Sequence, residues 1–314
     1  MIGTPAHRPT VTCVLLNWNG WRDTLVCLRA LAACDYPNMA LLVIDNGSTD
    51  GSVERIRRAH PDVQLIETGR NLGFGAGANV GLRRAVERGA DYVWLLNNDT
   101  EPHPQALTEL VKKACTDPAL GAVGSVMRYL HDPQKIQAWG GGRVSHWVGR
   151  SIHAVAPQAD GWFDYITAAS VLLSRRALQD VGLFDEGFFL YWEDVDLAFR
   201  LRARGWQLGV AADSSVLHKE NASTGGDRNV VARHSTASGI RFLSKYSPLP
   251  WLSIPLFICM RAGRRLSSGQ IRDIGSVTAG VRDYLRSDRR RRDERGALLT
   301  KAAEPPRHTM TERE

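Results

Sequence analysis

A run of aromatic side chains in the second half of the chain leads directly into three acidic residues. The run is Phe188–Trp192, and Glu193, Asp194 and Asp196 follow it. Acids at the start of a helix are favoured by the helix dipole, which alone is sufficient reason for them. A carboxylate beside Trp and Tyr side chains is also how a general base is placed in a partly dry pocket.

A second acidic candidate, Asp99, ends the segment Asn97–Asp99 after the apolar run Tyr92–Leu96. A carboxylate at the end of a strand can hold a hard divalent cation, which prefers oxygen ligands and often shares the phosphates of a substrate. A polar turn is the alternative, because Asn and Asp are common turn residues. Farther along, His218 follows another apolar pair, and a lone histidine is structural unless other ligands converge on it.

Two glycine-containing segments also end apolar runs. The side chains of Asp45–Ser52 can accept hydrogen bonds from a ribose or a base, and Ser48 or Asp50 can equally cap a helix. Gly73–Ala78 resembles a G-x-G-x-x-A dinucleotide loop. However, it follows the third apolar run rather than the first, and the next strand-end acid, Asp99, comes 26 residues after Gly73, where about 20 is typical. A dinucleotide-dependent oxidoreductase is therefore disfavoured.

These polar segments need a scaffold that brings them together, and the first hundred residues predict one. Strand-length apolar runs alternate with amphipathic helical segments, which indicates a mainly parallel sheet with right-handed crossovers. Such sheets bind ligands beyond the carboxyl ends of their strands, where every polar segment above is located. The predicted strands are Val11–Leu16, Leu41–Ile44, Val63–Ile66 and Tyr92–Leu96, and the helices between them include Trp21–Ala33 and Ala78–Arg88.

The middle of the chain gives a less regular pattern. Periodicity is weak from Gly121 to Asp164, and Gly140–Gly142 predicts a turn or a flexible loop. Around this part, a strand is expected over Tyr165–Leu173, and helices over Pro102–Cys115, Arg175–Val181 and Glu193–Arg204.

Together, five segments in this order resemble glycosyltransferase family 2, and within it the rhamnosyltransferase-like branch that builds cell-surface polysaccharides. The resemblance extends from about Val11 to Tyr246. It rests on Val14–Gly20, Asp45–Ser52, Asn71–Gly75 with Asn79, Leu96–Asp99, and Gly182–Glu186 through Glu193–Leu197.

The resemblance implies a role for each candidate residue. It makes Asp194 the catalytic base, Asp99 the metal-binding acid of a D-x-D-like motif, and His218 a further metal or diphosphate contact. It implies that Asp45 and Asn79 help to hold the nucleotide. The other expected nucleotide-sugar contacts are Asn17, Ser48, Asn71, Gly73 and Asn98, and the expected acceptor-site residues are Glu193 and Trp192.

Two segments depart from the family pattern. Thr167–Ala169 stands where relatives often have glycine, so the floor of the acceptor site is expected to differ. Ser238–Arg241 stands where relatives often carry Arg-Asn, which affects the expected diphosphate contacts.

The resemblance implies an α/β GT-A fold, Rossmann-like with helices flanking the sheet, over residues 1–246. Its nucleotide-binding half is about 8–100 and its acceptor half about 101–246. It also implies inverting transfer of a hexose or deoxyhexose, with rhamnose as one candidate, from a dTDP-, UDP- or GDP-sugar to a glycan or lipid-linked acceptor, with Mn²⁺ or Mg²⁺ as cofactor. A catalytically silent nucleotide-sugar-binding or scaffold protein is the alternative from another class.

The C-terminal part carries the positive charge. The net charge is +7, and residues 261–295 contribute eleven Arg against five acids. A basic run after the apolar segment Pro248–Met260 indicates an anionic membrane surface rather than a nucleic acid. That segment is too short to span a bilayer, so it is either interfacial or part of the core. We therefore expect a membrane-associating extension over 247–285 and a disordered charged tail over 286–314.

The cysteines and the N-terminus bear on the compartment. Five cysteines without a C-x-x-C pair favour a reducing compartment over a disulfide framework. The first ten residues contain no apolar stretch typical of a secretory signal. We therefore expect a cytoplasmic protein at the inner face of the cell membrane.

Overall fold

Four strands from the first hundred residues form the parallel half of a nine-stranded sheet. They are β1 (Val11–Asn17), β2 (Met39–Asp45), β3 (Gln64–Glu67) and β4 (Tyr92–Asn97), in the order β3-β2-β1-β4. The computed structural model describes residues 8–219, 228–267 and 274–303. All four strands lie where the apolar runs predicted them, because buried parallel strands are apolar on both faces.

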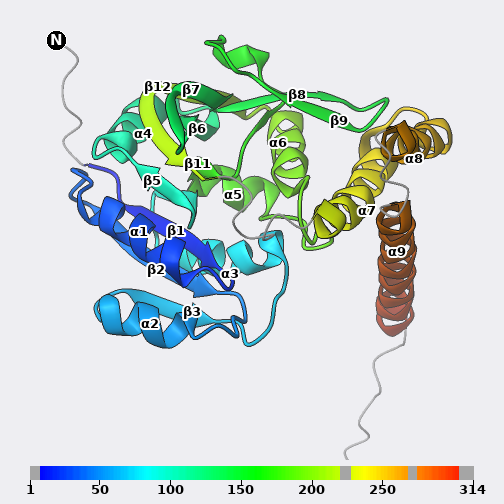
Figure 1. Cartoon of the computed structure of the whole chain (residues 1–314), viewed down its shortest axis with the longest axis horizontal. Helices are drawn as coiled ribbons and strands as arrows, with labels where there is room; N and C mark the ends of the chain where they lie inside the picture. The colour runs from blue at the N-terminus through cyan, green and yellow to red at the C-terminus, as the bar shows by residue number, and fades with distance from the viewer. Residues whose placement is uncertain (1–7, 220–227, 268–273, 304–314) are drawn as a thin grey trace, which may run out of the picture.

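Helices cover both faces of this half, as Figure 1 shows. Alternate side chains of β1 point to opposite faces, so Val14 packs under α3, whereas Cys13 and Leu15 pack under α1. The helices are α1 (Trp21–Ala32), α2 (Ser52–Ala59) and α3 (Phe74–Glu87). The right-handed crossovers bring the polar segments after β1, β2 and β4 to one edge of the sheet.

The second half of the sheet is mixed. An antiparallel strand, β11 (Ser170–Ser174), pairs with β4 on one side and with β6 (Leu120–Tyr129) on the other. Beyond it lie β12 (Gln207–His218), parallel to β6, and β5 (Thr100–Pro102) on β12, while β7 (Asp132–Trp139) pairs with β6. The helices of this half are α4 (Ala106–Ala114), α5 (Arg175–Val181) and α6 (Glu193–Ala203), with a 3-10 turn η1 (Asp160–Trp162).

A small second sheet stands where a flexible glycine loop was expected. It consists of β8 (Gly141–Ser145), β9 (Arg150–His153) and β10 (Tyr165–Ile166). The glycines allow close packing of backbones: a Cβ on Gly141 would lie 1.9 Å from the carbonyl oxygen of Tyr165. Of the two alternatives, the turn is present at Gly140, which joins β7 to β8 with φ 71°, whereas Gly141 and Gly142 lie in a strand and not in a flexible loop.

Two further expectations need correction. The strand predicted over Tyr165–Leu173 is broken at Thr167–Ala169, where the backbone bonds elsewhere: Thr167 N–H donates to the Gly140 carbonyl at 3.0 Å. The helix predicted over Pro102–Cys115 begins only at Ala106, because β5 occupies the chain as far as Pro102.

Three helices form the C-terminal part: α7 (Arg228–Tyr246), α8 (Pro250–Ser267) and α9 (Ile274–Ala303). Figure 1 shows them on the side of the sheet away from β2, β3 and α2. The tail expected to be disordered from 286 onward is instead helical as far as Ala303, and 304–314 lies outside the described residues. No helix within the described ranges is long and apolar enough to cross a membrane.

Candidate active site

The edge where the strands end opens into a pocket of about 460 Å³ between the sheet, α6, β9 and α8. The pocket brings together three of the predicted chemical residues: Glu193 and Asp194 at the start of α6, and His218 at the end of β12. Asn97, Arg150, Ser151, His153, Tyr165, Thr167, Tyr191, Trp192, Ser235 and Arg261 also line it.

Asp194 lies in the first turn of α6, half-buried at the wall of this pocket. Its Oδ2 accepts a hydrogen bond from Ala168 N–H at 3.2 Å, and its Oδ1 accepts one from Val195 N–H at 2.8 Å. The break in the predicted strand thus supplies a backbone donor that orients the carboxylate. Thr167–Ala169, where the family often has glycine, forms part of the pocket wall beside it.

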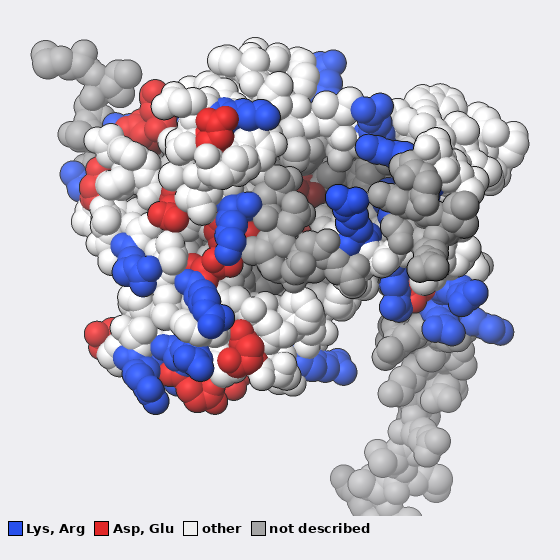
Figure 2. Space-filling model, in the orientation of Figure 1, with Lys and Arg blue, Asp and Glu red and all other residues white. Residues whose placement is uncertain are grey.

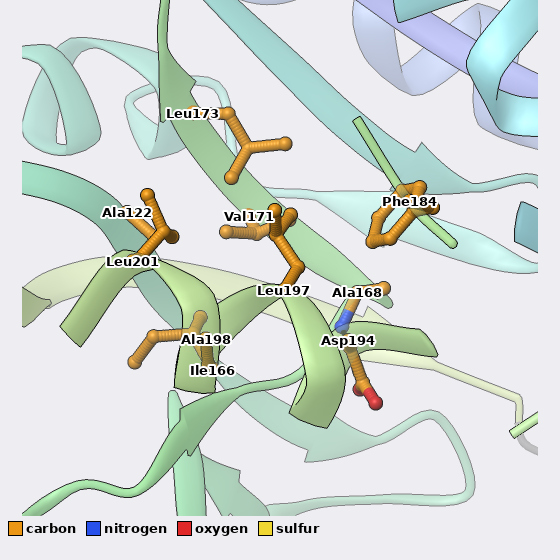
Figure 3. Close-up of a pocket in the computed structure, with 10 residues that line it drawn as sticks. All are labelled: Ala122, Ile166, Ala168, Val171, Leu173, Phe184, Asp194, Leu197, Ala198 and Leu201. Carbon is orange, nitrogen blue, oxygen red and sulfur yellow. Dashed lines mark hydrogen bonds between the residues drawn. The ribbon is translucent and has the colours of Figure 1, made fainter. Parts of the chain in front are cut away.

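Apolar packing behind Asp194 changes its acidity. Figure 3 shows Asp194 at the rim of an apolar cavity of about 10 Å³, with its carboxylate pointing away from side chains such as Leu197 and Val171. Burial raises the pKa of Asp194 above its usual value, and hydrogen bonds from the backbone of Ala168 and Val195 partly oppose the rise. A carboxylate with a raised pKa is a stronger proton acceptor once it is ionised.

Glu193 is buried beside it, and its Oε2 has no hydrogen-bond partner among the described residues. Burial raises the pKa of Glu193 well above its usual value, and the negative charge of Asp194 raises it further. Two carboxylates this close do not both ionise readily. We assign the proton of the pair to Glu193, whose side chain is the more buried, which leaves Asp194 ionised.

Asp196, the third acid, has a structural role. It is fully buried, and its carboxylate accepts from Arg200 Nε at 2.9 Å, from Tyr246 Oη at 2.8 Å and from Lys245 Nζ. The bonds from Lys245 and Tyr246 tie α6 to α7, and the bond from Arg200 lies within α6. With both oxygens engaged, Asp196 has no lone pair directed at a substrate, so the choice of base lies between Asp194 and Glu193.

The last two residues of the aromatic run Phe188–Trp192 have a strained backbone conformation at the start of α6. Tyr191 and Trp192 have φ values of 68° and 72°, which are unfavourable for bulky residues with a Cβ. Neighbours on α7 support them: Ser238 Oγ–H donates to the Leu190 carbonyl at 2.8 Å, and Trp192 stacks on Phe242 with centroids 4.6 Å apart. Backbone strain of this kind persists where the surrounding packing imposes it, and it aims the first turn of α6.

Asp99 and His218 meet at the end of β4 and β12. Nε2 of His218 lies 3.3 Å from Oδ1 of Asp99, and that buried oxygen makes no hydrogen bond with any described residue. On the other side of the ring, Nδ1 lies 2.8 Å from Oε1 of Gln137. If Nδ1–H donates to that oxygen, a neutral ring presents the lone pair of Nε2 to the carboxylate. Two acceptors facing each other in this way fit a bound cation between them.

The protein supplies few ligands for such a cation. Over the described ranges, no three His, Cys, Asp or Glu side chains converge as a metal cluster. An oxygen and an imidazole nitrogen suit a divalent ion whose remaining ligands come from phosphates and water. The residues present therefore fit a metal that binds together with its substrate.

The predicted nucleotide-binding residues form one hydrogen-bonded network after β1, β2 and β4. Asn17 Nδ2 donates to Asp45 Oδ1 at 2.8 Å and to Ser48 Oγ at 3.1 Å, and Ser48 N–H donates to Asp45 Oδ2 at 2.9 Å. Asn98 joins through Thr24, whose hydroxyl accepts from Asn98 Nδ2 at 2.8 Å. Asn17, Asp45 and Asn98 are buried, so the network fixes the rim of the site rather than presenting free carboxylates.

Asn71 and Gly73 shape the loop before α3. Asn71 Oδ1 accepts from Gly73 N–H at 2.8 Å, and Asn46, which sequence analysis did not single out, donates to the Gly73 carbonyl at 3.0 Å. Gly73 has φ 86°, and a Cβ there would lie 2.4 Å from the carbonyl oxygen of Phe189. Only glycine fits this contact, which brings the loop against the aromatic run Phe188–Trp192.

Asn79 is not among the residues that line the pocket, and its amide makes hydrogen bonds within the fold. It is buried, and its amide bonds in both directions to Phe184: Nδ2 donates to the carbonyl and Oδ1 accepts from the N–H, each at 3.0 Å. Nδ2 also donates to Glu186. Every polar atom of the amide thus anchors the Phe184–Glu186 loop, and a nucleotide contact by Asn79 stays a prediction.

Among the lining residues that sequence analysis did not single out, two are arginines. Arg150 lies on β9, in the region of weak periodicity, and Arg261 was counted only within the basic run. A sequence signal existed for Arg261: it lies four residues after Phe257 and eight after Ser253, the buried face of α8.

Comparisons with known proteins agree with this geometry. A sequence model of "Glycosyl transferase family 2" matches residues 12–166, and one of "Glycosyl transferase family group 2" matches 92–260. An N-acetylglucosaminyl-diphospho-decaprenol L-rhamnosyltransferase of Mycobacterium tuberculosis is 28% identical over 295 residues, covering 84% of this chain and 91% of that protein. A galactofuranosyltransferase of Mycolicibacterium smegmatis is 24% identical, with 66% and 70% covered.

Solved structures show the same fold. A mannosyltransferase of Pyrobaculum calidifontis, in complex with GDP-Man and Mn²⁺, superposes with a TM-score of 0.56 at 20% identity, covering 95% of this chain and 81% of its own. A structure of GalNAc-T7 with UDP, GalNAc and Mn²⁺ has a TM-score of 0.61 at 14% identity, with 77% and 49% covered. This chain therefore belongs to glycosyltransferase family 2, is a glycosyltransferase with a GT-A fold, and resembles the rhamnosyltransferase-like branch of that family.

Proposed function

We propose that this protein transfers a hexose or deoxyhexose from a nucleoside diphosphate sugar to a glycan or lipid-linked glycan acceptor, with inversion at the anomeric carbon. Its relatives are named as rhamnosyl- and galactofuranosyltransferases, and the mycobacterial rhamnosyltransferase is named for a diphospho-decaprenol acceptor. Rhamnose is accordingly our first candidate donor sugar, and cell-surface polysaccharide synthesis our proposed process.

The placement of Asp194 carries this proposal. The carboxylate of Asp194 is oriented by two backbone donors at the pocket wall, whereas the carboxylate of Asp196 is held in a buried ion pair. In a single displacement one base takes the proton of the acceptor hydroxyl as that oxygen attacks the anomeric carbon. The leaving diphosphate departs from the opposite face, so the configuration inverts without a covalent enzyme intermediate.

The pair Asp99 and His218 is proposed to hold a divalent cation, Mn²⁺ or Mg²⁺. When bound, such an ion neutralises the charge of the leaving diphosphate as a Lewis acid. Solved structures of similar fold contain Mn²⁺ together with GDP-Man or UDP. The nucleotide itself is proposed to lie along the network of Asn17, Asp45 and Ser48.

Titration of the protein with UDP, dTDP and GDP, each with and without Mn²⁺, tests the donor site. We expect one nucleotide to bind with micromolar affinity that depends on the metal. A panel of the corresponding nucleotide sugars, with product analysis, then identifies the donor. Failure of all three nucleotides to bind would contradict the transferase, and metal-dependent binding without any turnover would favour a silent nucleotide-sugar-binding protein.

The outer face of α8 is proposed to contact an anionic membrane at the cytoplasmic surface. Trp251 is 73% exposed, and Leu252, Leu256 and Met260 are 44–49% exposed on the same helix. Figure 2 shows the outer surface over α8 without charged side chains, and Lys and Arg side chains gathered beside it and around the first part of α9. Apolar side chains flanked by arginines fit the interface of an anionic bilayer.

Charge placed on that face tests the contact. Because Trp251 and Leu256 are exposed, Trp251→Glu with Leu256→Glu leaves the fold intact and should abolish co-sedimentation with vesicles of phosphatidylglycerol. The matched control is Ile152→Glu, at an exposed apolar residue of β9. Binding that survives the α8 changes, or that does not weaken as salt is raised, would contradict this contact.

A further inference from the structure

Arg261 lies on the inner face of α8 and has no acidic partner among the described residues. It projects from the face of the helix that also carries Ser253 and Phe257, and its side chain lines the pocket that contains Asp194. Its guanidinium donates to Ser235 Oγ and lies 5.2 Å from the centre of the Phe257 ring. Its Nε is buried and has no hydrogen-bond partner among the described residues.

The surroundings of Arg261 make its charge costly. Burial, together with the positive charges of Arg265 and Arg264, lowers the pKa of Arg261 to about 10. None of the ion pairs between described residues includes Arg261 or Arg150, the second arginine of the pocket. A partly desolvated guanidinium beside other cations destabilises the folded protein unless an anion binds next to it.

The position of the two arginines indicates which substrate carries that anion. The nucleotide candidates Asn17, Asp45 and Ser48 follow β1 and β2, whereas Arg150 and Arg261 come from β9 and α8. Figure 1 places β9 and α8 on the side of the sheet away from β2 and α2. The arginines therefore belong to the acceptor side of the pocket.

Resting on the proposed function, we propose that Arg261 and Arg150 form an anion subsite for a phosphate or diphosphate group that links the acceptor sugar to its lipid. A guanidinium fork binds phosphate oxygens with charge-assisted hydrogen bonds, and the free Nε–H of Arg261 is one such donor. The outer face of the same helix carries Trp251 and Leu256. One helix thus presents apolar side chains to the lipid and an arginine to the group that joins lipid and sugar.

Binding of geranyl diphosphate, with geraniol as its uncharged counterpart, tests the subsite without any transfer reaction. Titrations in vesicle-free buffer compare the wild-type protein with Arg261→Met, which keeps the packing volume and removes the charge. We expect geraniol to bind the wild type at least tenfold more weakly than geranyl diphosphate. We expect Arg261→Met to weaken geranyl diphosphate binding about tenfold or more, without lowering Tm.

Two controls separate this subsite from general charge and from the donor site. Arg264→Met removes the same charge from an exposed position of α8 and should change geranyl diphosphate affinity less than about twofold. UDP, dTDP and GDP with Mn²⁺ should bind Arg261→Met as they bind the wild type. If Arg261→Met does not fold, Arg150→Met and Arg261→Lys, which lacks the fork, should each weaken binding.

Three results would overturn the proposal. Equal losses in Arg261→Met and Arg264→Met would indicate unspecific attraction. An equal loss of nucleotide binding would place the arginines at the donor diphosphate. Equal affinity of the wild type for geraniol and geranyl diphosphate would remove the subsite. Failure of every nucleotide to bind would instead count against the transferase, because geranyl diphosphate binding is measured independently of it.

Discussion

Replacement of Asp194 by Asn separates the chemistry of α6 from its structure. Asn is the same size but does not accept a proton at neutral pH, so the acceptor hydroxyl loses its base. General-base loss lowers rates by about 10²–10⁴, which corresponds to about 2.7–5.4 kcal/mol in the activation free energy. Donor binding with Mn²⁺ should be unchanged, because the nucleotide network and Asp99 are elsewhere.

The same substitution should cost little stability. Asp194 accepts one hydrogen bond from Ala168 and one from Val195, and an Asn side chain retains a single acceptor oxygen. The lost bond costs about 1 kcal/mol. Removal of a desolvated negative charge beside Glu193 offsets part of this loss. Tm should therefore stay within about 4 °C of the wild type.

Asp196→Asn is the matched comparison, two residues along the same helix. Its carboxylate is fully buried among Arg200, Lys245 and Tyr246, and breaking a buried ion pair costs roughly 3–5 kcal/mol. Taking the lower end, Tm should fall by roughly 6–12 °C, while kcat of the folded protein stays within about tenfold of the wild type.

Single-turnover kinetics with a saturating donor, alongside thermal melts, measures both effects. The expected pattern is a loss of rate without a loss of stability at Asp194, and the reverse at Asp196. Near-normal turnover in Asp194→Asn, with transfer abolished in Glu193→Gln, would refute our assignment of the base. A product that retained the anomeric configuration of the donor would refute the single displacement itself.

Three further substitutions give distinct outcomes. Asp99→Asn should weaken Mn²⁺-dependent nucleotide binding about tenfold or more, with little change in metal-free binding, as titration calorimetry would show. Asn79→Ala should lower the free energy of unfolding by roughly 2–4 kcal/mol, because it removes buried hydrogen bonds to Phe184 and Glu186. Its nucleotide affinity should not change. A selective loss of nucleotide affinity in a stable variant would instead support a nucleotide contact by Asn79. The pKa of Glu193 is higher in the folded protein than in the unfolded chain. The stability that protonated Glu193 contributes is therefore complete below its unfolded pKa, and it is lost as pH rises through its folded pKa. Glu193→Gln lacks that loss, so melts from pH 5 to 8 should show its Tm advantage growing with pH, and a growing deficit would contradict the raised pKa.

The nucleotide half could be predicted from sequence because its signals are local. The central strands β1 and β4 are buried on both faces, and each strand there ends in a polar segment, as β4 does at Asn97–Asp99. The meeting of Asp99 with His218 followed only from the resemblance, because β12 reaches β5 through a pairing more than a hundred residues apart in sequence.

The acceptor half and the C-terminal extension were harder to predict because their glycines and one proline have unusual uses. Gly124 and Gly141 lie in strands where another backbone approaches closely, and Pro255 lies within α8. Residue type at these positions predicts turns, whereas tertiary packing decides otherwise. The roles of Asn79 and Asp196 were invisible for a related reason: whether a polar side chain serves a ligand or the fold depends on partners that only the structure reveals.

The two left-handed residues before α6 set a limit on how this enzyme can be improved. Glycine at Tyr191 would relieve an unfavourable φ of 68° and would remove a side chain from the pocket wall. The relief of backbone strain would come with a more mobile first turn of α6, and hence with a wider distribution of Asp194 orientations. Laboratory evolution for thermostability alone would drift toward such a change, whereas selection for turnover would keep the aromatic pair. At Tyr191 and Trp192, selection for thermostability and selection for turnover therefore favour different residues.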